Sequence, residues 1–414
     1  MNRKLQIGFV FLLIIVSIKF FDAQFVNQSV INYLQYLMIL VALFLSLPYI
    51  ATTKKGFVFP VQLLLLSFLI SIPMAYIYWE QGLKDGLIAT APYLMFAFFF
   101  YLLRTNFPIK ILEKIIVIYG VLYILLYLFQ FINAPTILFG KSLWGDEFTE
   151  NRGIVRIIFP GGGLFILSSF LAVTKLTSQR KHLWFWGIMT IFGVVIPVLQ
   201  VTRQFIAGIL LIYLYHSIKN LSLSKKIGII VSFATVAVIV QYLSLPVIEG
   251  LIESTESDAS QGSDYIRILA GEYFLFDFSP SALTGFFGNG VPYTGVSNYG
   301  IFLDMLNDTQ GFFLSDVGLI AVYAMFGIPA VLAYILIWVK SFTYSLPKEY
   351  YYLKYYLWFL LITSLTWYTP YHYHYLATTI IVLYMYQTLT ENHRMENTQD
   401  TSSKKETVTD NIEQ

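Results

Sequence analysis

The chain alternates between long apolar runs and short polar connectors. A run of roughly 17–25 apolar residues is long enough to cross a bilayer as a helix. We therefore predict an all-α polytopic membrane protein with about twelve transmembrane helices. The predicted spans are residues 5–21, 30–50, 57–78, 86–103, 111–133, 157–176, 183–201, 204–219, 227–246, 316–339, 354–369 and 374–389.

Two segments do not fit this alternation, and they set the predicted domain organisation. Residues 1–390 form the transmembrane domain, which includes one long external loop at about 247–315. Residues 391–414 have few large apolar side chains, which predicts a disordered cytoplasmic tail.

Within the loop, the sequence from Ser263 onward predicts an amphipathic helix that Ser263 or Asp264 caps. The very apolar stretch 274–278 is expected to lie on the membrane or on the helix bundle. The stretch from Gly285 to Gly290 is rich in turn residues.

Composition agrees with a membrane protein and excludes several classes of function. Hydrophobic residues make up 57% of the 414 positions and charged residues only 12%, about half the charge of a soluble domain. A net charge of +2 is too small to indicate nucleic-acid binding. The absence of cysteine excludes disulfides, thiolate metal sites and cysteine nucleophiles.

The charges of the connectors predict the orientation. With the N-terminus inside and strict alternation, 19 of the 26 Lys and Arg residues fall on the inner side and seven on the outer side. Acidic residues show the opposite distribution, with 16 of 24 outside. Because cytoplasmic loops are enriched in Lys and Arg, we expect a multi-pass protein whose two termini are both cytoplasmic.

Arg203 is one of the few cations on the outer side, in the minimal connector between the seventh and eighth spans. Its guanidinium stays charged, and placing it among closely connected helices is costly unless an anion pairs with it. An arginine at the end of a span also commonly reaches to lipid headgroups. Its position on the outer side makes anion binding an equal alternative.

Three more outer arginines are candidates for the same role. Arg267 lies on the predicted loop helix, where a local pair with Asp264 is the simpler explanation. Arg152 and Arg156 precede the sixth span and its Pro160 and glycines. Such small residues permit either a broken helix end that approaches a ligand or close packing between helices.

Candidate proton acceptors are fewer. Asp308 and Asp316 lie near the start of the tenth span, although most acidic residues of an outer loop only interact with solvent. His372 and His374 occupy an aromatic hairpin, which is typical of an interfacial belt, with a histidine base as the alternative. We find no cluster of residues with metal-ligand spacing.

The order of these motifs resembles the O-antigen polymerase and ligase superfamily of membrane glycosyltransferases, which includes the polymerases of polysaccharide repeat units. The shared features are about twelve spans, a Thr-Arg pair at a tight external turn, and an arginine on a late external loop. A Gly-rich stretch follows, and the next span begins Asp316-Val317-Gly318-Leu319-Ile320. An Arg-to-Pro-Gly stretch (Arg156, Pro160, Gly161) precedes the sixth span. The likeness covers about the middle half of the chain.

The resemblance implies a glycosyltransferase of GT-C-like architecture in the bacterial cytoplasmic (inner) membrane, without cofactor or metal and with inversion at the anomeric carbon. Its substrate would be an oligosaccharide linked to undecaprenyl diphosphate, for capsule, O-antigen or exopolysaccharide. Its partners would include the bilayer and possible flippase and chain-length proteins. Arg203 and Arg267 would hold the diphosphate, with Arg156 and Arg152 as further candidates.

The resemblance also bears on the base and on the competing functions. Ligases of the superfamily have a histidine shortly before the Gly-Leu-Ile span, where this chain has Asn307 and Asp308. This departure favours a polymerase over a ligase, with Asp308, Asp316 and His372 as the candidate catalytic residues. A lipid-linked glycan flippase is an alternative, but transporters usually have ionisable groups at mid-membrane. An interaction protein would have less need of the arginines.

Overall fold

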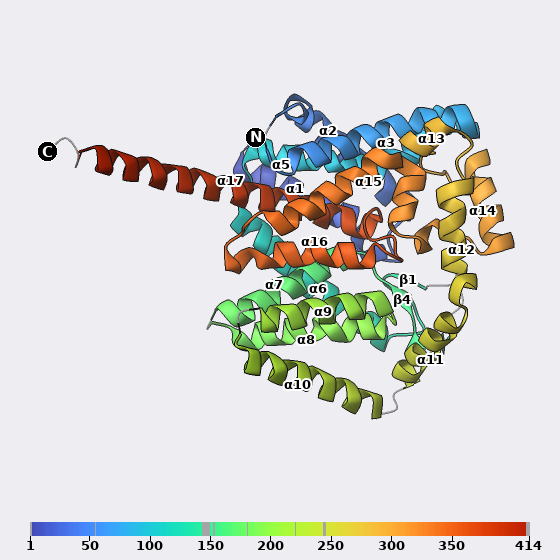
Figure 1. The fold of residues 1–414 in the computed structure, drawn as a ribbon. Coiled ribbons are helices and arrows are strands. Elements are labelled where there is room, and N and C mark those ends of the chain that lie inside the picture. The colour runs from blue at the N-terminus through green and yellow to red at the C-terminus, as the bar shows by residue number, and fades with distance from the viewer. Residues whose placement is uncertain are drawn as a thin grey trace.

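The computed structural model describes residues 2–53, 55–142, 150–151, 154–179, 181–219, 221–242 and 246–410 (Figure 1). The prediction of an all-α fold is confirmed. In the described chain, β-structure is limited to two short antiparallel pairs: β1 (Lys141–Ser142) with β4 (Ile157–Ile158), and β2 (Glu150–Asn151) with β3 (Ile154–Val155).

Each of the twelve predicted apolar segments coincides with helix over most of its described residues. The α-helices are α1 (Arg3–Ser17), α2 (Gln28–Ile50), α3 (Val58–Trp79), α4 (Leu83–Thr90), α5 (Phe98–Thr105), α6 (Ile109–Ile132), α7 (Gly162–Ser178), α8 (Leu183–Leu199), α9 (Arg203–Ile218), α10 (Leu223–Tyr242), α11 (Pro246–Ser260), α12 (Ile266–Glu272), α13 (Ala282–Phe287), α14 (Asn298–Gln310), α15 (Leu319–Thr343), α16 (Tyr351–Thr363) and α17 (Tyr373–Asp410). Among the described residues, five helical segments are long and apolar enough to cross a membrane: α2, α3, the run Leu83–Thr105, α6 and α15.

The helices pack around α7, whose residues from Gly162 to Thr174 are all buried. It contacts α6, α8, α16 and α17. The outer helices instead expose large apolar side chains; on α2 these include Tyr33, Leu37 and Phe44. Apolar side chains at such spacing on an outward face need lipid rather than water around them, which agrees with a membrane protein.

The segment between α10 and α15 forms a group of short helices at one end of the molecule (Figure 1). Both chain termini lie toward the opposite end. The predicted cap of the loop helix is wrong: α12 begins at Ile266 with Tyr265 as its N-cap residue, and no side chain caps it. Ser263 and Asp264 instead belong to the preceding 3₁₀ turn η3 (Gly262–Asp264).

Part of the apolar stretch 274–278 packs on the bundle, one of the two predicted locations, whereas Phe276 is 78% exposed. The stretch lies in the π-helical segment η4 (Tyr273–Asp277), where Phe274 is buried. The next residue, Phe278, stacks on Trp79 of α3 with ring centroids 5.3 Å apart. Tyr299 of α14 stacks on the same indole at 4.7 Å and is also fully buried. These rings fix the loop to α3.

The Gly-rich stretch holds α13 against α3 and α15. Gly290 has φ +83°, and a Cβ there would lie 2.6 Å from the Cβ of Ala75 and 2.7 Å from the Ser71 carbonyl oxygen. The buried Asn289 accepts a hydrogen bond from Trp79 Nε1 (2.9 Å) and donates from Nδ2 to the Ala324 carbonyl oxygen (2.9 Å). The glycines therefore serve close packing of backbones.

Gly318 begins α15 in a conformation that favours glycine, with φ +54° and ψ −118°. A Cβ at this position would overlap the carbonyl oxygen of Ser364, the same oxygen that accepts the Leu319 N–H at 2.8 Å. The start of α15 is thus held directly against the end of α16. This contact gives a physical reason for the glycine in the sequence from Asp316 to Ile320.

We expect Gly318→Ala to destabilise the protein strongly, because backbone strain of about 1–3 kcal/mol adds to a steric overlap. The thermal unfolding midpoint of the detergent-purified protein should fall by several degrees, with less folded protein recovered. Gly187→Ala on α8 is the matched control, since nothing lies within 4 Å of a Cβ there. Equal midpoints for both variants would contradict the assignment.

Helix α17 continues beyond residue 390 to Asp410 and extends away from the other helices (Figure 1). An isolated polar helix of this length is marginally stable in water. The expected disorder of the tail in solution therefore stays a prediction.

Candidate functional site

A cavity of about 290 Å³ lies where the start of α9, the loop helix α12 and the connector between α16 and α17 meet. Tyr265, Ile266 and Arg267 in its wall belong to the loop segment, which lies at one end of the molecule (Figure 1). The side chains that matter for its chemistry are Arg156, Arg203, Arg267, Asp258, Asp316, Tyr265 and Trp367. All seven are half-buried.

Arg203 is the first residue of α9 and follows a tight turn. The turn is closed by a hydrogen bond from Thr202 N to the Pro197 carbonyl oxygen (3.2 Å), and it places Val201 at φ +53°. This conformation is unfavourable for a β-branched residue, so the surrounding packing holds it. The guanidinium of Arg203 forms an ion pair with Asp258 of α11 and donates to Thr255 Oγ1 at 3.0 Å.

Arg267, on the first turn of α12, pairs with a residue far away in sequence. Its Nε is 3.4 Å from Oδ2 of Asp316, so Asp316 replaces Asp264, the local partner considered from sequence. Its guanidinium also lies 5.9 Å from the centre of the Tyr265 ring. Burial raises the pKa of Tyr265, although the charge of Arg267 opposes this shift. The Tyr265 hydroxyl lies 3.4 Å from Asp258 Oδ2.

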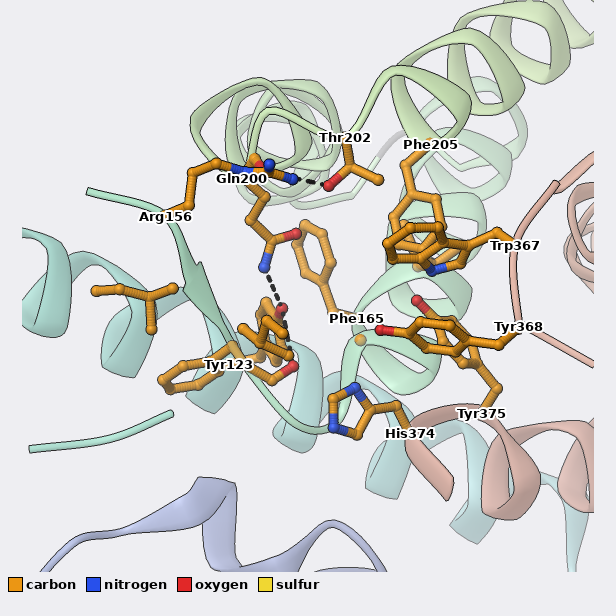
Figure 2. A pocket seen from close by; sticks show the side chains of 15 residues that line it. Tyr123, Arg156, Phe165, Gln200, Thr202, Phe205, Trp367, Tyr368, His374 and Tyr375 are labelled. Atoms are coloured by element: carbon orange, nitrogen blue, oxygen red, sulfur yellow. Dashed lines mark hydrogen bonds between the residues drawn. The ribbon is translucent and has the colours of Figure 1, made fainter. Parts of the chain in front are cut away.

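Arg156 lies between β3 and β4 and also lines the cavity; Figure 2 shows its side chain next to Gln200. Its Nε donates to the Gln200 carbonyl oxygen at 3.1 Å, and the Gln200 side chain donates to the Tyr123 hydroxyl at 2.9 Å. The turn before α9 therefore orients Arg156 and Arg203 together.

Arg156, Thr202 and Trp367 also line a second, narrower pocket of about 50 Å³. Figure 2 shows its aromatic wall, in which Trp367 stacks on Tyr368 with centroids 4.5 Å apart. The side chain of His374 also lines this pocket and is only 5% exposed. Within the described chain, its Nε2 is buried without a hydrogen-bond partner.

The cavity has a surplus of positive charge. Three arginines line it against two carboxylates, Asp258 and Asp316. The side chains of the pairs Arg203–Asp258 and Arg267–Asp316 keep 21–30% of their surface exposed. The guanidinium groups of Arg203 and Arg267 are therefore neutralised but still accessible. Planar guanidinium groups bind phosphate or carboxylate oxygens in pairs, which makes this a suitable site for an oxyanion of more than one charge.

The structure brings together four of the seven residues predicted for the site: Arg156, Arg203, Arg267 and Asp316. Arg152 lies outside the described residues. Asp308 is exposed on α14 and lines neither of these two pockets. His372 is likewise absent from these pocket walls; its ring packs against Tyr368 with centroids 4.2 Å apart.

The sequence interpretation did not single out Asp258, Tyr265, Gln200 or Trp367 for the site. Asp258 looked like one of several solvating acids in a Ser-rich stretch. Trp367 belonged to an aromatic hairpin that we interpreted as an interfacial belt. Only the proximity of Gln200 and Thr202 to Arg203 in sequence could have indicated their roles.

His372 is expected to contribute little to proton transfer. Burial, with the charges of Lys19 and Lys141, lowers its pKa to about 3, so the ring is neutral and weakly basic between pH 5 and 8. We expect His372→Gln to change the rate of the reaction proposed below by less than about threefold and to leave its pH profile unchanged. A lost acidic limb in that profile would identify His372 as the base.

Comparison of the sequence with protein-family models and with curated proteins finds no significant match. The protein is therefore helical, and its apolar helices indicate a membrane environment. It has a cavity lined by arginines at one end.

Proposed function

We propose that this protein is a membrane glycosyltransferase that polymerises undecaprenyl-diphosphate-linked oligosaccharide repeat units into a surface polysaccharide. The observation that carries the proposal is the convergence of Arg156, Arg203 and Arg267 on one cavity. They come from three distant parts of the chain. In the superfamily that the sequence resembles, arginines of this kind hold the diphosphate.

In the proposed topology, the chain crosses the bacterial cytoplasmic membrane about twelve times, both termini are cytoplasmic, and the cavity opens on the outer face. The opposite placement of the termini and the short loop helices is compatible with this topology (Figure 1). The surplus of basic connectors on the side of the termini supports it independently.

The reaction proposed for the cavity is a displacement at the anomeric carbon of the donor glycan. A hydroxyl oxygen of the acceptor sugar forms the new bond, and the bond between the anomeric carbon and the diphosphate oxygen breaks. Undecaprenyl diphosphate leaves with the electron pair. Attack opposite the leaving group inverts the configuration.

The arginines would stabilise the charge that develops on the departing diphosphate. The ion pairs with Asp258 and Asp316 keep the guanidinium groups in place while the cavity is empty. A diphosphate carries more charge than one carboxylate and offers more acceptor oxygens, so it can compete for the same donors. Fixed cationic groups of this kind act mainly on the transition state.

Asp316 is our proposed proton acceptor. It lines the cavity, whereas Asp308 does not. When the diphosphate takes over the guanidinium of Arg267, the Asp316 carboxylate is released from its ion pair and can accept the proton of the attacking hydroxyl. Asp258 is a second carboxylate in the cavity, but it pairs with Arg203 on the other wall.

The aromatic residues divide into two groups. Tyr299 is fully buried and stacks on Trp79, so it packs the loop and is not available to a sugar. Phe286 is 46% exposed but does not line the cavity. Trp367 does line it, which makes this indole the better ring to stack on a sugar next to the diphosphate.

The test is reconstitution of the purified protein into liposomes with short oligosaccharides linked to undecaprenyl diphosphate. We expect longer glycan and an equal amount of free undecaprenyl diphosphate for each bond formed. A flippase would move the substrate across the bilayer with no change in its length. Products that carry the glycan only on a different acceptor lipid would indicate a ligase.

A further inference from the structure

A second large pocket, of about 890 Å³, lies at the opposite end of α7 from the arginine cavity. It is formed by the N-terminal part of α6, the C-terminal end of α7 and the start of α8. Arg156 precedes α7 and Lys175 lies in its last turn, so a helix of 17 residues, about 25 Å long, separates the two sites.

The pocket is basic. Lys110, Lys114 and Lys175 line it, together with Glu113 and Glu349. Glu113 is already held, because Lys175 Nζ is 3.5 Å from its Oε1 and the Tyr352 hydroxyl donates to it at 2.8 Å. Lys110 and Lys114, one turn apart on an exposed face, form no ion pair with a described carboxylate. They are available for an anion.

The rest of the wall is apolar and aromatic. Val117, Ile118 and Leu171 continue from the lysines along the helices, and Trp184 and Trp186 stand on the other side. Lysines beside an apolar and aromatic wall match a ligand with a charged head and hydrocarbon tails.

We propose that this pocket binds an anionic glycerophospholipid from the leaflet on the side of the chain termini. Lys110 and Lys114 would bind the headgroup phosphate, and the acyl chains would follow Val117 and Ile118. Basic pockets between transmembrane helices on the cytoplasmic side are suited to such headgroups. This site is separate from the proposed reaction and does not depend on it.

The test is native mass spectrometry of the detergent-purified protein titrated with phosphatidylglycerol. The Lys110→Gln, Lys114→Gln double variant should bind it roughly 30-fold more weakly. Each lysine next to an anionic headgroup strengthens binding by roughly a factor of five, and two are removed. The control is Lys225→Gln, Lys226→Gln on α10, which removes the same charge at residues that do not line the pocket. This control should bind like the unaltered protein.

Two further measurements identify the class of ligand. Zwitterionic phosphatidylcholine should bind at least tenfold more weakly than phosphatidylglycerol. Glycerol 3-phosphate should fail to displace the lipid at equal concentration. Displacement by this soluble headgroup would indicate a site for a free phosphate, and equal binding in both lysine double variants would show non-specific adsorption. Either result overturns the proposal.

Discussion

Arg203→Ala is expected to lower the rate of glycan polymerisation by about 10²–10³-fold while the protein stays inserted and folded. The guanidinium lines the cavity, is partly accessible and lies across from Arg267 and Arg156. Its removal would take away one of the fixed positive groups that stabilise the departing diphosphate. In cells, single lipid-linked repeat units should accumulate. The reconstituted system gives the rate directly.

Two controls separate a role in binding diphosphate from a role in structure. Arg104→Ala removes an exposed guanidinium that donates to the Leu45 carbonyl oxygen and lines none of the pockets described, and it should leave the rate unchanged. Arg203→Ala combined with Asp258→Asn removes the carboxylate that would otherwise lose its partner. If the double variant regains activity, the role of the ion pair is structural. Full-length polymer from Arg203→Ala alone would contradict the assignment of Arg203 to diphosphate binding.

Arg203→Lys tests the shape of the group as well as its charge. A lysine keeps the charge but presents no planar pair of donors to a diphosphate, so we expect an activity between those of the unaltered protein and Arg203→Ala. Activity equal to that of the unaltered protein would mean that only charge matters at this position.

The sequence predicted the helices well because long apolar runs determine them. The segments 30–50 and 57–78 became α2 and α3 almost unchanged. The loop was predicted less well, since local signals there compete with packing. Ser263 and Asp264 had the chemistry of a helix cap, yet the chain forms a 3₁₀ turn at Gly262–Asp264 and α12 starts after Tyr265. That start allows Arg267 to reach Asp316.

Residues of the site could be predicted from sequence where their charge was rare on that side of the membrane. They could not be predicted where several residues of the same type lie close together in the chain. Arg203 and Arg267 were outer cations in a chain that concentrates its cations inside, so they could be selected from sequence. Asp258 could not, because it is one of several acids in the same stretch. The choice between Asp308 and Asp316 also required the structure, since the two are only eight positions apart.

The last prediction concerns these two carboxylates. Asp316→Asn is expected to lower the polymerisation rate by about 10²–10⁴-fold, the usual contribution of a general base. The variant keeps the size of the side chain and a hydrogen-bond acceptor for Arg267, but the amide cannot take the proton of the attacking hydroxyl. Asp308→Asn is the matched control, because this exposed residue lies on α14 away from the cavity. It should retain nearly full activity.

Binding must be measured alongside the rate, because Asp316 also holds Arg267. If Asp316 acts as the base, the variant should still bind undecaprenyl diphosphate, and more tightly if anything, since a competing negative charge has gone. If Asp316 only positions Arg267, affinity for the diphosphate should fall together with the rate. A large loss of rate in Asp308→Asn but not in Asp316→Asn would move the proton acceptor to α14. The loop would then have to change its position before the reaction could occur.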